Sequence, residues 1–113
     1  NRVKVVVDQN NDAIYFSREK ISTKGKNNSR IYYKQGNIFC FNKKSLNYFI
    51  NLKPSNLEIT ESVDMNRLIE NRFKIKMVKT NFHTINVDNY RDYLAAKKAM
   101  RKDKYFKIYH KKI

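Results

Sequence analysis

The chain has 113 residues, of which 25 are Lys or Arg and 10 are Asp or Glu, so its formal net charge is +15. This length allows one domain at most. Apolar residues make up 41% and aromatic residues 13% of the sequence, which excludes a disordered tail. No run approaches the roughly eighteen apolar residues of a membrane span, and two glycines and one proline argue against Gly-rich phosphate loops.

The positive charge has two interpretations. It suits a nucleic-acid binder, in which Lys and Arg contact phosphates and release counterions. A coat of Lys is also compatible with many other functions, because sequences rich in Lys, Asn and Ile often reflect the base composition of a genome. Salt dependence separates the two, since affinity for nucleic acid falls steeply as salt is added.

The beginning of the chain predicts a hairpin followed by a loop. Residues 3–8 are rich in β-branched side chains, and residues 13–17 form a second apolar run. The Asn and Asp residues at 9–12 are typical of a turn, because both tolerate left-handed backbone and hydrogen-bond to their own chain. Residues 18–30 are polar and charged, which indicates a loop.

Further along, residues 31–33 and 37–41 predict strands. The single cysteine, Cys40, lies in this second apolar run, where we expect a buried, reduced thiol in the cytosol. Asn42 can cap a short helix, because its side chain can accept a hydrogen bond from the first turn. Pro54 ends that helix.

The second half of the chain predicts more helix than strand. Ser55 or Asn56 opens a longer helix that runs through Ile69, with an acidic start that suits a helix N-terminus. Residues 73–78 alternate between polar and apolar, which predicts a half-buried strand, and residues 84–88 predict a short one.

The final helix begins at Asn89, which forms a capping-box-like pair with Asp92. Strands that alternate with helices indicate an α/β fold. Eight of the sixteen residues at 97–112 are basic. They predict a solvated helix end and a frayed terminus, or alternatively a contact with RNA or an anionic membrane in which the neighbouring aromatic residues take part.

Three segments, taken in order, resemble the CMP-3-deoxy-manno-octulosonate synthetase family. Residues 3–18 are similar to its hairpin VKVV.D..G.ALYFSR. Residues 33–41 and the helix at 52–67 match its YRHIGIY and LPPSPLE.IE.LEQLR segments. Residues 75–78 and 87–94 lead into and occupy the position of its GVDTPEDL. Each motif is of moderate specificity, but the ordered set is strong.

The resemblance implies the C-terminal part of a Rossmann-like nucleotide-diphospho-sugar transferase fold, with a mixed sheet, flanking helices and pairing as a homodimer. It implies Mg²⁺-dependent transfer of CMP from CTP to a 3-deoxy-manno-octulosonate-like sugar acid, with release of pyrophosphate, in cytoplasmic lipopolysaccharide biosynthesis. Residues 1–100 would be the sugar-binding part of the cytidylyltransferase domain, and residues 101–113 a basic C-terminal tail.

The resemblance also implies one metal ligand. Asp88 matches the Asp of VDTPEDL, which in the family binds the catalytic magnesium together with an Asp from the N-terminal half. Carboxylate oxygens suit this hard cation, which keeps water and phosphate oxygens as its other ligands. The alternative is that Asp88 only caps the following helix, a task for which Asn89 is well suited.

Five residues are candidates for binding the sugar acid. Glu58, Glu61 and Asp64 recur at steps of three and are expected on one helix face, with Glu61 in contact with a sugar hydroxyl. A solvated acidic face is the alternative for Glu58 and Asp64. Gln35 stands where the family has His, and both can hydrogen-bond a hydroxyl. Arg18 matches the Arg after YFS, whose planar fork suits a carboxylate, with a structural role as the alternative.

The sequence also departs from the family. Glu19-Lys20 replaces its Ile-Pro, and Asp64-Met65 replaces its Glu-Gln, which leaves the identity of the sugar acid open. The family's nucleotide-binding loop and its first metal Asp belong to an N-terminal half that this sequence does not contain. His83 and His110 are isolated and are expected at the surface. We therefore expect no catalytic residue in this chain, no turnover by it alone, and the N-terminal half as its partner; a basic nucleic-acid-binding or non-catalytic interaction module is the alternative function.

Overall fold

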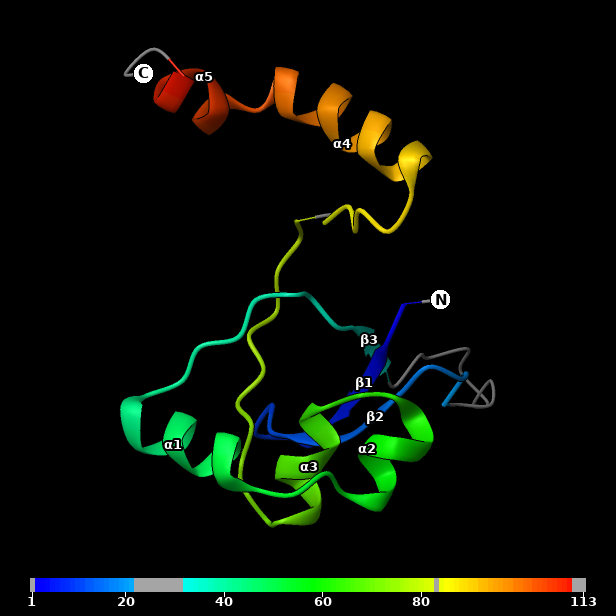
Figure 1. Ribbon diagram of the computed structural model, residues 1–113, viewed down its shortest axis with the longest axis vertical. Helices are drawn as coiled ribbons and strands as arrows, with labels where there is room; N and C mark the ends of the chain where they lie inside the picture. Colours follow the sequence, from blue (N-terminus) through cyan, green and yellow to red (C-terminus); the bar gives the residue numbers. More distant parts are fainter. Residues whose placement is uncertain (1, 22–31, 83, 111–113) are drawn as a thin grey trace. The chain divides into compact units, whose positions relative to one another are not determined.

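The computed structural model describes residues 2–21, 32–82 and 84–110. It has three strands and five helices within these ranges (Figure 1). The elements are β1 (Lys4–Val7), β2 (Ala13–Ser17), β3 (Tyr32–Lys34), α1 (Lys43–Asn51), α2 (Asn56–Glu61), α3 (Met65–Glu70), α4 (Tyr90–Lys102) and α5 (Lys104–His110). They belong to two compact units, Asn1–Thr80 and Asn81–Ile113.

The sheet of the first unit confirms the predicted hairpin. Its strand order is β2-β1-β3 and both pairings are antiparallel, so that Val5 lies opposite Phe16 on one side and Tyr33 on the other. The turn forms because the carboxylate of Asp8 accepts hydrogen bonds from two backbone N–H groups of the turn, at 2.8 and 2.9 Å. Asn11 takes the left-handed conformation there, with φ at 61°, as Asn does readily.

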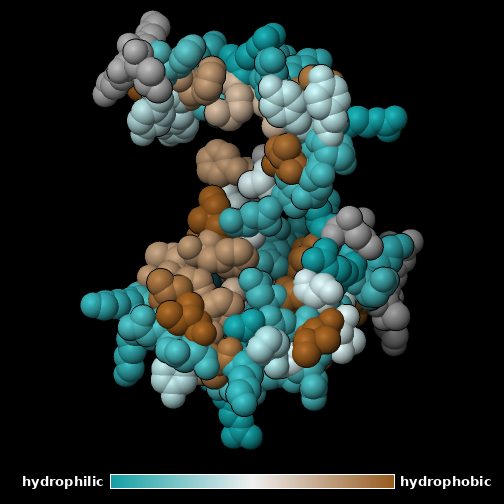
Figure 2. Space-filling model, in the orientation of Figure 1, coloured by the Kyte–Doolittle hydropathy of each residue, from teal (hydrophilic) through white to brown (hydrophobic). Residues whose placement is uncertain are grey.

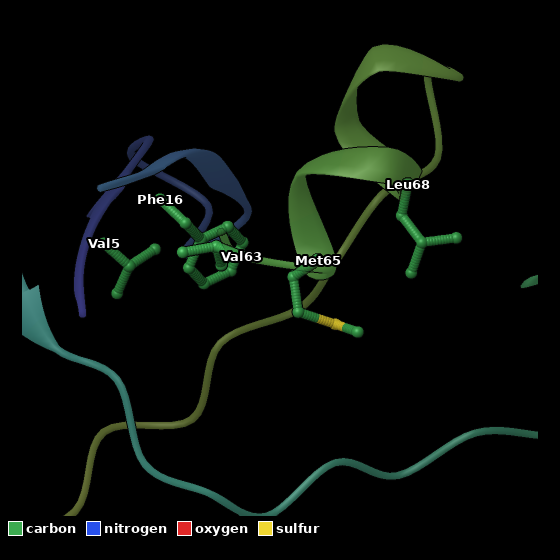
Figure 3. Close-up of a cluster of buried hydrophobic side chains, with 5 residues drawn as sticks. All are labelled: Val5, Phe16, Val63, Met65 and Leu68. Atoms are coloured by element: carbon green, nitrogen blue, oxygen red, sulfur yellow. The ribbon is translucent and has the colours of Figure 1, made fainter. Parts of the chain in front are cut away.

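The hydrophobic core lies where β1 and β2 meet the chain around α3 (Figure 3). The sheet contributes the buried side chains of the hairpin, and the α3 region contributes the rest. These core residues are Val5, Phe16, Val63, Met65 and Leu68. With only five fully buried apolar side chains in the described residues, each of them carries a large share of the burial that stabilises this unit.

A buried amide completes the outer edge of the sheet. Asn66 has no exposed surface. Its Oδ1 accepts a hydrogen bond from the Phe16 N–H at 3.2 Å, and its Nδ2 donates one to the Phe16 carbonyl at 3.0 Å. The side chain therefore takes the place of a neighbouring strand. Because a buried backbone group without a partner costs about 1–3 kcal/mol, this amide fixes α3 against β2.

The prediction of one long helix from residue 55 to Ile69 is wrong, because the helix is interrupted after α2. Ser62 is left-handed, with φ at 52° and ψ at 45°, and its N–H closes the helix on the carbonyl of Glu58. The break turns Val63 into the core, where it is 4% exposed. Asp64 then begins α3, so it does not share a helix face with the acidic residues of α2.

Three predicted strands are also absent, at residues 37–41, 73–78 and 84–88. The second comes nearest. Its apolar side chains pack against the core in the expected alternation, but it forms only an isolated bridge between Lys76 and Asp12. The reason is that it runs past the turn of the hairpin, where two backbone hydrogen bonds are made, instead of along the body of a strand.

The expected burial of Cys40 is wrong as well. Residues 37–41 pair with no strand within the described ranges, and Cys40 is exposed as a free thiol. Its neighbour Ile38 is 88% exposed and Phe39 is 45% exposed. Apolar side chains continue onto the surface of α1, which lies in the first unit (Figure 2).

The second unit confirms the predicted final helix and its cap. The Asn89 side chain accepts a hydrogen bond from the Asp92 N–H at 3.0 Å. The carboxylate of Asp92 reaches back to the N–H of Asp88, at 3.2 Å, one residue earlier than a capping box requires. Part of the basic tail is helical, because α5 extends through His110. None of the helices described is both long and apolar enough to cross a membrane.

Candidate functional site

Two of the predicted site residues, Arg18 and Gln35, lie at one end of the sheet of the first unit. Lys4, near the start of β1, pairs with Ser17 on β2 and with Lys34 on β3. The residues that follow those partners, Arg18 and Gln35, therefore emerge at the same end of the sheet. Antiparallel register thus places two residues that are seventeen positions apart in the sequence at the same end of the sheet, on either side of β1.

Glu61, at the end of α2, links this edge of the sheet to the helix. Its carboxylate accepts hydrogen bonds from the Tyr15 hydroxyl, from the Ser17 hydroxyl at 2.9 Å and from the Arg18 N–H at 3.2 Å. The residue predicted to bind a sugar hydroxyl is thus already engaged by three donors of its own chain. This arrangement makes Glu61 a residue that positions β2 and Arg18.

Arg18 is held in place by the end of α2. Its Nε donates to the carbonyl of Glu61 at 3.2 Å, and its Nη2 donates to the carbonyl of Ser62 at 2.9 Å. These carbonyls have no partner within a helix that ends here, so the guanidinium caps it. Nη1 makes no hydrogen bond with any described residue. The side chain is exposed, and this end of its fork can still meet a carboxylate.

The pKa values of this cluster shift in opposite directions. The hydrogen bond from Tyr15 is the main cause that holds the pKa of Glu61 below its usual value, with Ser17 and Arg18 adding to it, while burial opposes them. The same bond raises the pKa of Tyr15. The folded chain therefore favours an ionised Glu61 beside a neutral phenol.

This shift predicts a pH-dependent contribution to stability. Glu61→Gln should lower the free energy of unfolding at neutral pH by about 1–2 kcal/mol. Because the pKa of Glu61 is lower in the folded than in the unfolded chain, its contribution is present above the unfolded value near 4.5 and is lost as the pH falls through the folded value. Urea unfolding should show the gap between wild type and variant closing in acid.

Glu19→Gln is the matched control, since Glu19 is exposed and no described residue bonds its carboxylate. It should leave the free energy of unfolding within about 0.5 kcal/mol of wild type at every pH. A Glu61→Gln variant that behaved in the same way would show that the three donors contribute nothing to stability.

Glu58 has a structural role. Its side chain forms a capping box with Ser55 at the start of α2, and both of its carboxylate oxygens accept hydrogen bonds from Arg67 of α3. Only 14% of the side chain is exposed. The bond from Arg67 is the main cause that lowers the pKa of Glu58. The carboxylate therefore ties two helices together.

Gln35 and Asp64 differ in their surroundings. The N–H of Gln35 donates to the carbonyl of Val3 at 2.9 Å, which continues the pairing of β3 with β1. Its Oε1 is buried, and none of the described residues donates to it. Asp64 is exposed at the start of α3 and makes no capping hydrogen bond. Both side chains thus retain acceptor oxygens that are not used within the described part of the chain.

Sequence reasoning missed three residues that organise this site. Tyr15 and Ser17 supply the hydroxyls that bond Glu61, and Arg67 bonds Glu58. The alternation of β2 could have indicated the first two, because residues two apart on a strand share a face. No local pattern indicates Arg67, whose partner lies nine residues earlier across a helix break.

Asp88 lies in the second unit, directly before the cap of α4. It is exposed, and no described residue bonds its carboxylate. The helix is capped by the Asn89 side chain, so capping does not explain Asp88. The described residues contain no group of three or more His, Cys, Asp or Glu that could hold a metal. One free carboxylate still fits magnesium, which takes one or two carboxylates and completes its shell with water and phosphate oxygens.

No family model matches this chain, but curated relatives resemble most of its length. It is 36% identical over 102 residues to the 3-deoxy-manno-octulosonate cytidylyltransferase of Chlorobium phaeobacteroides. The aligned region covers 89% of this chain and 41% of the relative. It is 40% identical over 94 residues to the enzyme of the same name from Lawsonia intracellularis, which covers 81% and 37%.

A solved structure gives the same result. CMP:2-keto-3-deoxy-manno-octonic acid synthetase complexed with CTP superimposes with a TM-score of 0.81 and 27% identity, over 89% of this chain and 42% of that one. The match confirms the predicted α/β fold class and places the chain among the sugar-acid cytidylyltransferases. Within that class, the chain belongs to the 3-deoxy-manno-octulosonate cytidylyltransferase family and corresponds to its C-terminal part. It spans about two fifths of the length of the curated relatives it matches.

Proposed function

We propose that this chain provides the sugar-acid-binding part of a cytidylyltransferase that transfers CMP from CTP to a 3-deoxy-manno-octulosonate-like sugar acid and releases pyrophosphate. The observation that carries the proposal is the similarity over nearly the whole chain to enzymes named for this transfer. The other three fifths of their length would supply the CTP-binding loop. The end of the sheet that carries Arg18 and Gln35 would receive the sugar acid.

The described contacts suggest a role for each candidate residue. Arg18 would meet the sugar carboxylate with the end of its guanidinium that α2 leaves free. The unused oxygens of Gln35 and Asp64 would accept hydrogen bonds from sugar hydroxyls. Glu58 and Glu61 would hold the surface that presents these groups. The site would thus use rigid, internally bonded carboxylates as its support.

Asp88 would be the residue through which this chain holds Mg²⁺. When bound, the metal ion would neutralise the charge of the CTP phosphates. In this proposal Asp88 contributes one carboxylate and the rest of the enzyme contributes the second. In this proposal the complete enzyme is a homodimer. The exposed apolar side chains at residues 38–39 and on α1 support this, since apolar surface of this kind marks interfaces.

The experiment is an assay of pyrophosphate release with CTP, Mg²⁺ and a panel of sugar acids. It is run on this chain alone and on the chain joined to the matching N-terminal part of a relative. We expect release only from the joined protein and only with sugar acids of the 3-deoxy-manno-octulosonate type. A joined protein that folds but stays silent with every sugar acid would contradict the proposal and make titration with nucleic acid the next measurement.

A further inference from the structure

The helix α5 and the end of α4 form a basic and apolar surface that the cytidylyltransferase proposal does not use. The two helices meet at Asp103, whose Oδ1 accepts hydrogen bonds from the N–H groups of Tyr105 and Phe106 at 2.8 and 2.9 Å. Asp103 is the sole acidic residue in the sequence from 97 to 110, and its charge is directed to the start of α5. The rest of this surface therefore has cationic groups without nearby acids.

One face of α5 is apolar and uncovered. Tyr105, Ile108 and Tyr109 are spaced so that they lie on one side of the helix. Their exposed fractions are 56%, 52% and 66%. Tyrosine and isoleucine in this pattern match the lipid-facing side of an amphipathic helix that lies in the plane of a membrane interface.

The cations lie beside this apolar face. Lys104 and Lys107 are three residues apart on α5 and therefore share a side of the helix, and α4 ends in Arg101 and Lys102. A hollow of about 390 Å³ opens between the helices and combines both kinds of side chain. It is lined by Arg101, Phe106, Lys107, Ile108 and His110. Apolar and polar side chains lie next to each other on this part of the surface (Figure 2).

The aromatic rings are arranged in a way that disfavours nucleic acid. The Nζ of Lys104 lies 4.9 Å from the centre of the Tyr105 ring, and the Phe106 ring is stacked on His110 at 5.3 Å. In α4 the Tyr93 ring stacks with a neighbouring tyrosine at 6.0 Å and has Lys97 over it. Bases bind single-strand-binding proteins by stacking on open ring faces, and here the Tyr105, Phe106 and Tyr93 rings each already have a cation or another ring nearby.

We propose that α5, together with the end of α4, docks on an anionic lipid surface. The lysines and arginines meet the lipid phosphates, the hollow accepts one headgroup, and Tyr105, Ile108 and Tyr109 enter the boundary between headgroups and acyl chains. Charge complementarity supplies the attraction, at about fivefold in affinity for each Lys or Arg near the surface. The apolar face supplies the part of the binding that salt does not screen.

The test is co-sedimentation of the full 113-residue chain with vesicles of phosphatidylcholine, alone or mixed with phosphatidylglycerol. Binding is expected only to the mixed vesicles. The double variant Lys104→Glu, Lys107→Glu should weaken it by at least about thirtyfold. The matched control is Lys43→Glu, Lys44→Glu on α1, which makes the same change in net charge and should retain most of the binding. The variant Ile108→Ser, Tyr109→Ser keeps every charge and should bind several-fold more weakly.

Three outcomes would overturn the proposal. Equal losses in the two lysine variants would mean that the net charge of the chain, and not this surface, attracts the vesicles. Full binding by the Ile108→Ser, Tyr109→Ser variant would exclude insertion of the apolar face. Binding of single-stranded RNA that depends on Lys104 and Lys107, with no binding to the mixed vesicles, would identify nucleic acid as the partner instead.

Discussion

Arg67→Ala is expected to lower the free energy of unfolding by about 3 kcal/mol, the lower end of the cost of removing one partner of a buried ion pair, because this pair is only partly buried. Only 15% of the Arg67 side chain is exposed. Its Nε and Nη2 bond the two carboxylate oxygens of Glu58, so alanine would leave that carboxylate largely desolvated and without its main partner. The total stability of a small domain is about 5–15 kcal/mol. This one change should therefore remove a large share of the free energy of unfolding.

The loss would extend beyond the ion pair, because Arg67 joins three helices. Its Nη1 donates to the carbonyl of Leu52 at 3.2 Å, at the end of α1. Its guanidinium carbon lies 4.8 Å from the centre of the Phe49 ring. Removing the side chain therefore weakens the attachment of both α1 and α2 to α3 at the same time. For the same reason Arg67→Lys should recover little, because a single ammonium cannot reproduce the planar fork.

Urea unfolding followed by circular dichroism would measure both variants. The matched control is Arg91→Ala, since Arg91 is an exposed helical arginine of α4 and should change the free energy of unfolding by about 0.5 kcal/mol or less. If Arg67→Ala and Arg91→Ala unfolded at the same urea concentration, the ion pair and its contacts with α1 would not hold the fold together.

Elements with strong local signals were predicted well from the sequence. The hairpin was predicted because two apolar, strand-like segments flank an Asn- and Asp-rich turn. This pattern favours two antiparallel strands, which β1 and β2 form. The helices beginning after Asn42 and Asn89 were predicted because a cap side chain and its first-turn partner lie within three residues of each other. In each case the residues that determine the structure are neighbours in the sequence.

Features that depend on distant contacts were not predicted. The alternation of residues 73–78 correctly indicated an extended, half-buried segment, but a strand also needs a partner, and this segment meets only the turn of the hairpin. The break at Ser62 was missed because the left-handed turn is stabilised by burying Val63, which follows from tertiary packing and not from helix propensity.

The candidate site shows the same division. The spacing of Glu58 and Glu61 drew attention to two carboxylates, and both prove to be highly connected. Their partners were missed, because the fold brings Tyr15 and Arg67 to them from positions 46 and 9 residues away. The alternation of β2 could have placed Tyr15 and Ser17 on one face, but it does not show which carboxylate they bond. A pattern of charges can therefore indicate that a carboxylate matters without indicating whether it binds a ligand or its own chain.

Asp88 is the candidate residue whose role is tested most directly by activity. In the chain joined to a matching N-terminal part, Asp88→Asn is expected to reduce Mg²⁺-dependent pyrophosphate release by at least about a hundredfold, since even residues that only support a metal ligand cost 10–100-fold when changed. Asparagine keeps the size of the side chain and one oxygen, but it removes the negative charge that attracts a hard cation.

Stability measurements separate this role from a structural one. The cap of α4 is supplied by Asn89, and the contact of Asp88 with Asp92 is made by its backbone N–H, so Asp88→Asn should leave circular dichroism and thermal unfolding unchanged. Asp103→Asn is the matched control. It is also an exposed aspartate before a helix of the same unit, and asparagine caps as well as aspartate, so it should retain full activity.

The dependence on magnesium concentration completes the test. If Asp88 binds the metal, the residual activity of Asp88→Asn should rise as Mg²⁺ is raised, because a site with fewer carboxylates needs more free cation to be filled. A variant with wild-type turnover at every Mg²⁺ concentration would remove Asp88 from the metal site. Because the Asp88 carboxylate has no other partner among the described residues, it would then be left without a role, and the magnesium ligand in this part of the enzyme would have to be sought elsewhere.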